Sequence, residues 1–350
     1  MSRPRPPLLL RRAHLPGWMA AVAALAVACG ACSPGTPSGP PRVEPIEILS
    51  GPAATTPADV AARLRADVEA LHALGERSTR RPAALEEAAR HIERALAAAG
   101  LPASRRPFAC DGLTIANIEV LLPGAAPEAP SLLVGAHYDS AADTAGADDN
   151  ASGVAVLLEL ARRVAAQHAR EPAFPARPLR LVAFVNEEPP HFRSESMGSL
   201  VMARELAARG ESPAAMLALE CLGYYDEAPG SQHYPAPLDA LYPDTADFLA
   251  FVGDVASAAL VQRCSAAFRA HGALACESAA LPDVLPGIGW SDHWSFWQTN
   301  VPAVMVTDTA LFRNPHYHEP SDDPDTLDFG RAARAADGLF AVLVALDTAS

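Results

Sequence analysis

The chain has 350 residues, half of them apolar, which is enough for one large α/β core or two small domains. Its formal net charge of -14 makes the surface repel phosphate backbones, so we expect no nucleic-acid partner. The sequence contains no lysine, which excludes a Walker-type phosphate lysine, a Schiff base and a catalytic lysine.

The first 32 residues have the pattern of an export signal. Arg11 and Arg12 precede an apolar run from Gly17 to Ala28, which is too short to span a bilayer comfortably. Small residues before Cys29 and Cys32 favour lipid attachment to one of these thiols; ordinary cleavage beside incidental cysteines is the alternative. We therefore predict a lipoprotein-type signal over 1–32 and a lipid anchor at a membrane. The protein would lie in the periplasm or cell envelope, or else be secreted.

Residues 33–56 are rich in Pro, Gly and Ser, which predicts a tether, and residues 57–350 are predicted to form one folded domain. Four cysteines fall in this domain. None has C-x-x-C spacing, so we do not expect cysteines to bind a metal ion. In an oxidising compartment Cys264 and Cys276 could form a local disulfide; four buried thiols are the alternative.

Helical and strand patterns alternate along this domain. Apolar residues at helical spacing predict helices over 57–74, 83–99, 152–166, 196–209, 247–270 and 329–346. Short apolar runs predict strands over 115–122, 131–137, 179–186, 214–222 and 301–307. We therefore predict a three-layer α/β/α fold with a central mixed, mostly parallel twisted sheet. A Pro-rich loop over 226–245 is too long to be a simple connector.

Polar residues follow several predicted strands, where functional groups of such sheets collect. His137-Tyr138-Asp139 places two side chains on one face of an extended segment. A neutral imidazole could bind a metal there while the carboxylate holds its other N–H. The pair Asp148-Asp149, in a Gly-flanked loop before a helix, could supply a bridging carboxylate or only helix-terminal charge.

Glu187 and Glu188 end a wholly apolar strand. Adjacent acids repel each other unless cations compensate them, and successive side chains point to opposite sides. We expect one of the two to bind metal and the other to take a proton from water that the metal activates.

The sequence offers alternatives for the remaining metal ligands. A further carboxylate ligand could be Glu220, at another strand end, or Asp226. A further histidine ligand could come from His316-Tyr317-His318 or be His293. The remaining histidines need no function: His14, His72, His91, His168, His191, His233 and His271.

Six motifs in order resemble the secreted co-catalytic zinc aminopeptidases of clan MH, whose relatives include glutaminyl cyclases and glutamate carboxypeptidases. The matching pieces span nearly everything from residue 57 onward: His137 to Ser140, Gly146 to Gly153, Asn186 to Glu188, Glu220, Ser291 to His293 and Asn314 to His318. The resemblance implies a zinc-exopeptidase (phosphorylase/hydrolase-like) fold, peptide substrates and two Zn²⁺ ions per chain.

The resemblance also implies a role for each matching residue. Asp149 would bridge the two ions, His137 and Glu220 completing one and Glu188 and His318 the other. It further implies Glu187 as general base, Tyr317 polarising the scissile carbonyl, Asp139 orienting His137, Asp292 behind the ligands, and a cis peptide bond between Asp149 and Asn150. Several known members have Asp where this chain has Glu220.

We therefore predict a monomeric zinc aminopeptidase, with glutaminyl-peptide cyclotransferase as the alternative. Family cyclases often have Trp before the last histidine ligand, where this chain has Tyr317. A carboxypeptidase would need a cation for the terminal carboxylate, and Arg193 is the candidate. A non-catalytic relative would be expected to lose ligands or the base, and this chain keeps them. The 226–245 loop, with Tyr224, Tyr225 and Tyr234 at or beside it, is expected to rim the specificity pocket.

Overall fold

The computed structural model describes residues 56–348. The predicted export signal, with Cys29 and Cys32, and the predicted tether up to residue 55 lie outside the described residues. Within 56–348, no helix has both the length and the apolar character needed to cross a bilayer.

One eight-stranded sheet organises the described chain, in the order β1-β2-β4-β3-β5-β8-β6-β7. Neighbours among β4, β3, β5 and β8 pair in parallel, whereas β6 and β7 pair in parallel with each other and β6 is antiparallel to β8. The strands are β1 (Ser104–Cys110), β2 (Leu113–Leu122), β3 (Leu132–His137), β4 (Leu179–Phe184), β5 (Ala215–Glu220), β6 (Phe248–Gly253), β7 (Ala275–Ala280) and β8 (Ala303–Thr307). The predicted fold class is confirmed.

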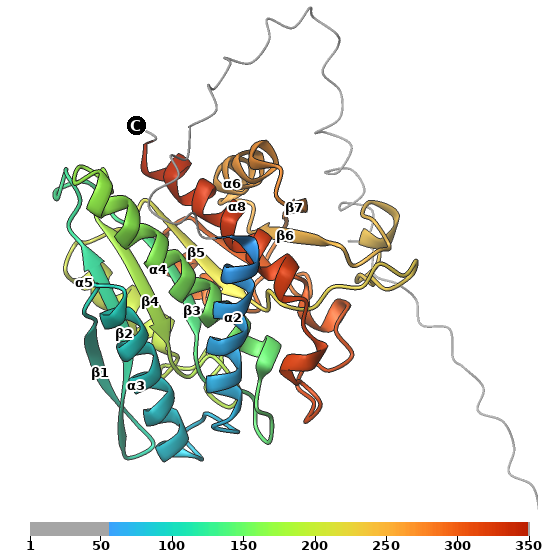
Figure 1. Ribbon diagram of the computed structural model, residues 1–350, viewed down its shortest axis with the longest axis horizontal. Helices are drawn as coiled ribbons and strands as arrows, with labels where there is room; N and C mark the ends of the chain where they lie inside the picture. Colours follow the sequence, from blue (N-terminus) through green and yellow to red (C-terminus); the bar gives the residue numbers. More distant parts are fainter. Residues whose placement is uncertain (1–55, 349–350) are drawn as a thin grey trace, which may run out of the picture. The chain divides into compact units, whose positions relative to one another are not determined.

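Helices cover both faces of the sheet (Figure 1). One apolar cluster packs under α2 (Pro57–His72), α3 (Pro82–Ala98), α4 (Gly153–Arg170), α6 (Ala258–His271) and α8 (Phe329–Asp347). A second cluster packs under α5 (Gly198–Ala208) and α7 (His293–Trp297). Within β3, Val134 belongs to the first cluster and Leu133 to the second, and burying each such side chain contributes about 1.5–3 kcal/mol.

The parallel strands deliver the site residues to one edge. β3, β4 and β5 are buried along their whole length, which is why they read as continuous apolar runs. His137 pairs with Phe184 in register, so the segment after β4 begins beside the end of β3. Glu220 likewise ends β5 opposite Thr307 of β8. Side chains far apart in sequence therefore meet at the carboxyl edge.

Three strands differ from the sequence prediction. The predicted helix over 247–270 is wrong in its first half, because Phe248–Gly253 is β6 and α6 begins at Ala258. A six-residue apolar run has no periodicity that separates strand from helix, and Asp254 turns the chain by accepting the Ser257 N–H at 2.8 Å. The edge strands β1 and β7 were not predicted, since their burial is partial and irregular.

The suggested disulfide is absent, because Cys264 and Cys276 are both free and buried. The Cys276 thiol instead lies 3.8 Å from the Ser265 carbonyl oxygen. The alternative of four buried thiols is confirmed for the described part of the chain.

Candidate metal centre

The end of β3 places one imidazole between two carboxylates. His137 Nε2 lies 3.3 Å from Asp149 Oδ1 and 3.3 Å from Glu220 Oε2. All three side chains are buried, and their ligand atoms lie close enough together to hold one ion. Glu187 Oε2 lies farther from the same nitrogen, at 3.9 Å.

A second group shares Asp149 with the first. His318 Nε2 lies 3.0 Å from Asp149 Oδ2 and 3.2 Å from Glu188 Oε2. The two oxygens of Asp149 therefore face different histidines, so this carboxylate belongs to both groups. This is the geometry of a bridging ligand.

The polar atoms of both groups fit metal ions. His137 Nε2, Asp149 Oδ1 and Glu188 Oε1 are buried and have no hydrogen-bond partner among residues 56–348. Such orphaned atoms are rare in folded proteins and require an explanation. Nitrogen and carboxylate donors without sulfur suit Zn²⁺, so the donor chemistry and the orphaned atoms agree.

Charges at the centre interact strongly because they are buried. Burial opposes ionisation of Asp149, yet the two histidines hold its pKa below the usual range. Burial and the neighbouring Asp149 carboxylate raise the pKa of Glu188 to about 8. Burial raises the pKa of Glu187 well above its ordinary value, although His137 opposes the rise. Cations at the two groups would relieve this crowding of acids.

The loop that carries Asp149 depends on two glycines. It is a distorted helical turn, η1 (Ala147–Ser152), with non-helical backbone at Asp149 and Asn150 and a cis bond between them, as predicted. Gly146 has φ 54°, and a Cβ there would lie 2.1 Å from the Asp149 carbonyl oxygen. A Cβ on Gly153 would lie 2.2 Å from Asn150 Oδ1. Side chains at either glycine would displace the turn.

Asn150 joins this turn to the end of β5. Its Nδ2 donates to the Leu219 carbonyl at 2.8 Å, and its Oδ1 accepts from the N–H groups of Gly153 and Cys221, each at 3.1 Å. Because Leu219 and Cys221 flank Glu220, these bonds fix Asp149 relative to Glu220.

Asp148 belongs to the scaffold of the centre. Its Oδ1 accepts the Gly223 N–H at 2.9 Å and its Oδ2 accepts from Asn314 Nδ2 at 2.7 Å. It is therefore directed away from the two ligand groups, and it links η1 to the segment that carries His318.

Asp139 holds the centre in a different way from the one expected. Its carboxylate accepts the N–H groups of Glu187 at 3.1 Å and Glu188 at 3.0 Å. The Nδ1 of His137 lies 3.2 Å from the Asp139 backbone oxygen and 3.7 Å from its carboxylate. The carboxylate thus positions the two glutamates, and the backbone carbonyl lies closest to the imidazole.

Two supporting residues were not anticipated from the sequence. Arg77 is fully buried and donates to the carbonyls of Tyr138 at 2.9 Å and Gly146 at 3.0 Å, and burial lowers its pKa to about 10. Asp322 accepts the N–H groups of Asp148 at 2.9 Å and Asp149 at 3.1 Å. Neither lies in a recognisable motif, and both act on backbone atoms that only the fold brings together.

The candidates that the sequence leaves open differ in position. Asp226 forms a bridge with Ala246 and accepts the Ala228 N–H, away from both groups. His293 Nε2 lies 2.7 Å from the Ile288 carbonyl oxygen, and His316 Nδ1 lies 2.9 Å from Ser321 Oγ. Of these candidates, the structure brings only Glu220 and His318 to the centre.

The segment before α7 supports Glu220. Ser291 Oγ donates to Glu220 Oε2 at 2.6 Å. Asp292 is buried behind the centre, where burial raises its pKa to about 7 and His137 opposes the rise. Arg193 stacks on Trp294 and donates to the Gly289 carbonyl at 2.8 Å, so one of its nitrogens is engaged within the protein.

A pocket of about 100 Å³ opens beside the centre. Glu220 and Tyr317 line it where it meets the ligand groups, and Tyr317 stacks on His318 with ring centroids 4.0 Å apart. Most of its remaining wall is apolar, including Phe248, Ile288, Trp290, Met305, Leu311 and Phe312. Tyr234, in the predicted rim loop, also lines it.

The sequence matches a known family over most of its length. The model of peptidase family M28 matches residues 117–343, which include both ligand groups. The chain belongs to peptidase family M28. Over 226 residues this M28 peptidase is 46% identical to the uncharacterized protein YfbL of Escherichia coli, covering 62% of this chain and 67% of that protein. It is 27% identical to a probable leucine aminopeptidase of Arthroderma otae over 57% of this chain, and it spans 49% of that relative's length.

Solved structures share the fold. The LapA aminopeptidase of Legionella pneumophila superposes with a TM-score of 0.65 at 16% identity, over 83% of this chain and 72% of that one. The glutaminyl cyclase of Porphyromonas gingivalis superposes with a TM-score of 0.59 at 19% identity, over 81% and 97%. At these identities the likeness shows the fold alone.

Proposed function

We propose that this M28 peptidase is an aminopeptidase that binds two Zn²⁺ ions and removes N-terminal residues from peptides. The observation that carries the proposal is the position of Asp149, whose two oxygens face His137 and His318 separately. One ion would be held by His137, Asp149 and Glu220, and the other by Asp149, Glu188 and His318. A relative named a probable leucine aminopeptidase supports this choice of reaction.

Bound zinc would supply a Lewis acid that makes water a nucleophile near neutral pH. Glu187 is suited to accept the proton of the attacking water, because it borders the centre without belonging to either three-residue group built around Asp149. Asp139 fixes the backbone of Glu187 and so the direction of its carboxylate. Glu187 would then return the proton to the departing amine.

Tyr317 and the pocket would position the substrate. Tyr317 lines the pocket beside the centre, and burial raises the pKa of its hydroxyl well above its ordinary value, so it stays a donor at neutral pH. We assign it to the scissile carbonyl oxygen. The apolar wall accepts an apolar N-terminal side chain, since burying apolar surface contributes about 25 cal/mol per Å².

The place of action is also a proposal. We infer an exported protein, with lipid at Cys29 or Cys32 holding it at the cell envelope and secretion as the alternative. A tether of about two dozen residues would let a monomeric domain reach peptides near the membrane.

Hydrolysis of N-terminal aminoacyl amides, with and without chelator, tests the reaction beside a cyclisation assay on Gln-peptides. We expect amide hydrolysis of leucine-type substrates that chelator abolishes and zinc restores. Cyclisation without amide hydrolysis would instead make the protein a glutaminyl cyclase.

A further inference from the structure

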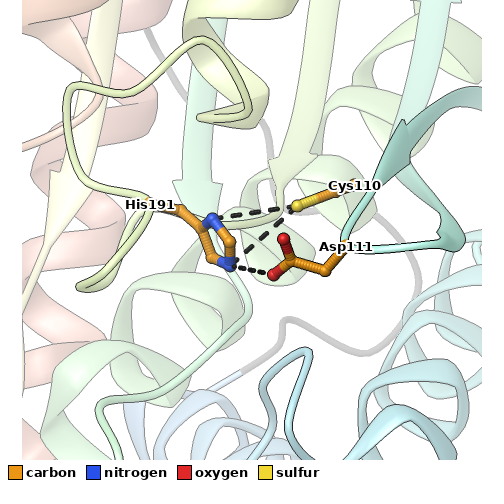
Figure 2. Close-up of side chains that lie close together, drawn as sticks. All are labelled: Cys110, Asp111 and His191. Atoms are coloured by element: carbon orange, nitrogen blue, oxygen red, sulfur yellow. Dashed lines mark hydrogen bonds and ion pairs between the residues drawn. The ribbon is translucent and has the colours of Figure 1, made fainter.

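A second kind of polar cluster lies at the tip of the β1–β2 hairpin, outside the catalytic centre. Cys110 ends β1 and pairs with Leu113 of β2, which leaves Asp111 and Gly112 as a two-residue turn. Both turn residues have positive φ, 51° and 78°, as such tight hairpin turns require. The turn points Cys110 and Asp111 toward His191, which comes from the loop after Glu188 (Figure 2).

A sulfur, a carboxylate oxygen and an imidazole nitrogen gather in this cluster. His191 Nε2 lies 3.3 Å from Asp111 Oδ2, and Cys110 Sγ lies 3.7 Å from Nδ1 and 3.9 Å from Nε2 of the same ring. Zinc bonds of about 2.0–2.3 Å at a tetrahedral angle would space such atoms about 3.3–3.6 Å apart. The Nε2–Oδ2 spacing matches that arrangement. The sulfur lies almost equally far from the two ring nitrogens, so the imidazole would have to turn for all three residues to bind one ion, and their ligand atoms lie close enough together for that.

The surroundings favour an ion over a reactive thiol. Cys110 is only 5% exposed, whereas the Asp111 side chain is 62% exposed, so the cluster opens to solvent through the carboxylate. A small cation can enter there, and a peptide cannot reach the sulfur. Asn186 Nδ2 donates to Cys110 Sγ at 3.2 Å, so an amide N–H faces the sulfur.

The cluster is joined to the loop that carries the catalytic glutamates. Asn186, which contacts Cys110, directly precedes Glu187. The His191 N–H donates to the Glu188 carbonyl at 2.9 Å, and Thr79 Oγ1 lies 3.1 Å from His191 Nε2. An ion held by Cys110 and His191 would therefore link the hairpin to both ends of the Asn186–His191 loop.

We propose that Cys110, Asp111 and His191 bind one divalent metal ion of the zinc type, separate from the catalytic pair, with water completing the coordination. The thiol proton passes to solvent when the sulfur–metal bond forms. The mixed sulfur, nitrogen and oxygen donors select zinc over magnesium or calcium. The ion clamps the β1–β2 turn to the Asn186–His191 loop.

Cobalt titration of the metal-free full chain tests this site, because a thiolate ligand gives Co²⁺ an intense sulfur-to-metal absorption in the near ultraviolet. Every sample carries Cys29→Ser and Cys32→Ser, so that this C-x-x-C pair contributes no band. The catalytic groups hold only nitrogen and oxygen donors, so they give no such band. We expect the band in the wild type, its loss in Cys110→Ser and its retention in the matched control Cys276→Ser. No band in the wild type, or a band that survives Cys110→Ser, would overturn the proposal.

A second pair of variants guards against misfolding of Cys110→Ser. Asp111→Asn, on the exposed turn, should weaken the Co²⁺ affinity of the band at least about tenfold with an unchanged circular dichroism spectrum. Asp143→Asn, another exposed acid with positive φ, should leave that affinity unchanged. Equal affinities for the two variants would exclude Asp111 as a ligand. The readout needs no hydrolysis, so it stands apart from the proposed function.

Discussion

The metal centre is held by a buried polar network, whereas the adjoining pocket is lined mostly by apolar side chains. At the centre, the buried carboxylates are positioned by hydrogen bonds that Asp139, Asn150 and Asp322 make to nearby backbone atoms. The pocket wall combines buried apolar side chains with partly exposed ones, and Trp290 and Leu311 are each 43% exposed. A polar network of this kind fails as a unit, whereas an apolar wall can change by degrees. Substitutions at the centre should therefore abolish the reaction, whereas substitutions in the pocket wall should change the substrate selectivity.

Metal removal should have the largest effect, because it leaves the buried carboxylates of the centre facing one another without compensating charge. We expect chelation to abolish hydrolysis and to lower Tm by at least about 5 °C, as scanning calorimetry would measure. Zinc should restore both. Hydrogen exchange should rise around Asp149 and Glu188 but not in β6 or β7. A uniform rise would contradict the contrast between centre and pocket.

Glu187→Gln should have the next largest effect. The amide keeps the shape of the side chain but accepts no proton, so kcat should fall by about 10²–10⁴-fold. Metal content, measured by elemental analysis, should stay at the wild-type value. Loss of metal in this variant would mean that Glu187 is a ligand and that Glu188 is the base.

Filling the pocket should have a smaller and selective effect. Ala279→Phe places a ring in the wall, which should lower kcat/KM for leucine-type amides by roughly 10–200-fold and for alanine-type amides much less. Ala275→Phe makes the same change at an exposed position of the same strand and should leave both values near wild type. An equal loss for both substrates would show that this pocket does not receive the N-terminal side chain.

His316→Ala should have the smallest effect, because His316 contacts Ser321 and not the centre. His318→Ala, two residues away, should lose one of the two catalytic metal ions. Elemental analysis of the pair separates the alternatives that the sequence leaves open. Equal metal loss from both variants would contradict the ligand set.

The metal centre was more predictable than the pocket. His137, Glu187 and Glu220 stand at or just beyond the ends of apolar strands, and parallel strands share a carboxyl edge, so their meeting follows from local pattern and topology. The choice of Asp149 over Asp148 came from family resemblance, and the structure shows its basis, since Asp148 is engaged by Gly223 and Asn314.

The sequence could not place the residues that act through the fold. Arg77 follows a helix with no motif around it. It becomes central only because backbone carbonyls from both ends of the loop between β3 and η1 accept hydrogen bonds from its guanidinium. The β6 strand was mistaken for helix because six apolar residues carry no period. His191 was assigned no function for a similar reason: its partners Cys110 and Asp111 are distant in sequence.

Anomalous diffraction at the zinc edge, from crystals of the zinc-loaded protein, tests the bridging role of Asp149 most directly. The structure predicts two peaks on opposite sides of the Asp149 carboxylate, one in contact with His137 and Glu220 and the other with Glu188 and His318. A single peak at the centre, or two peaks that do not share Asp149, would contradict the two-metal centre proposed for this M28 peptidase.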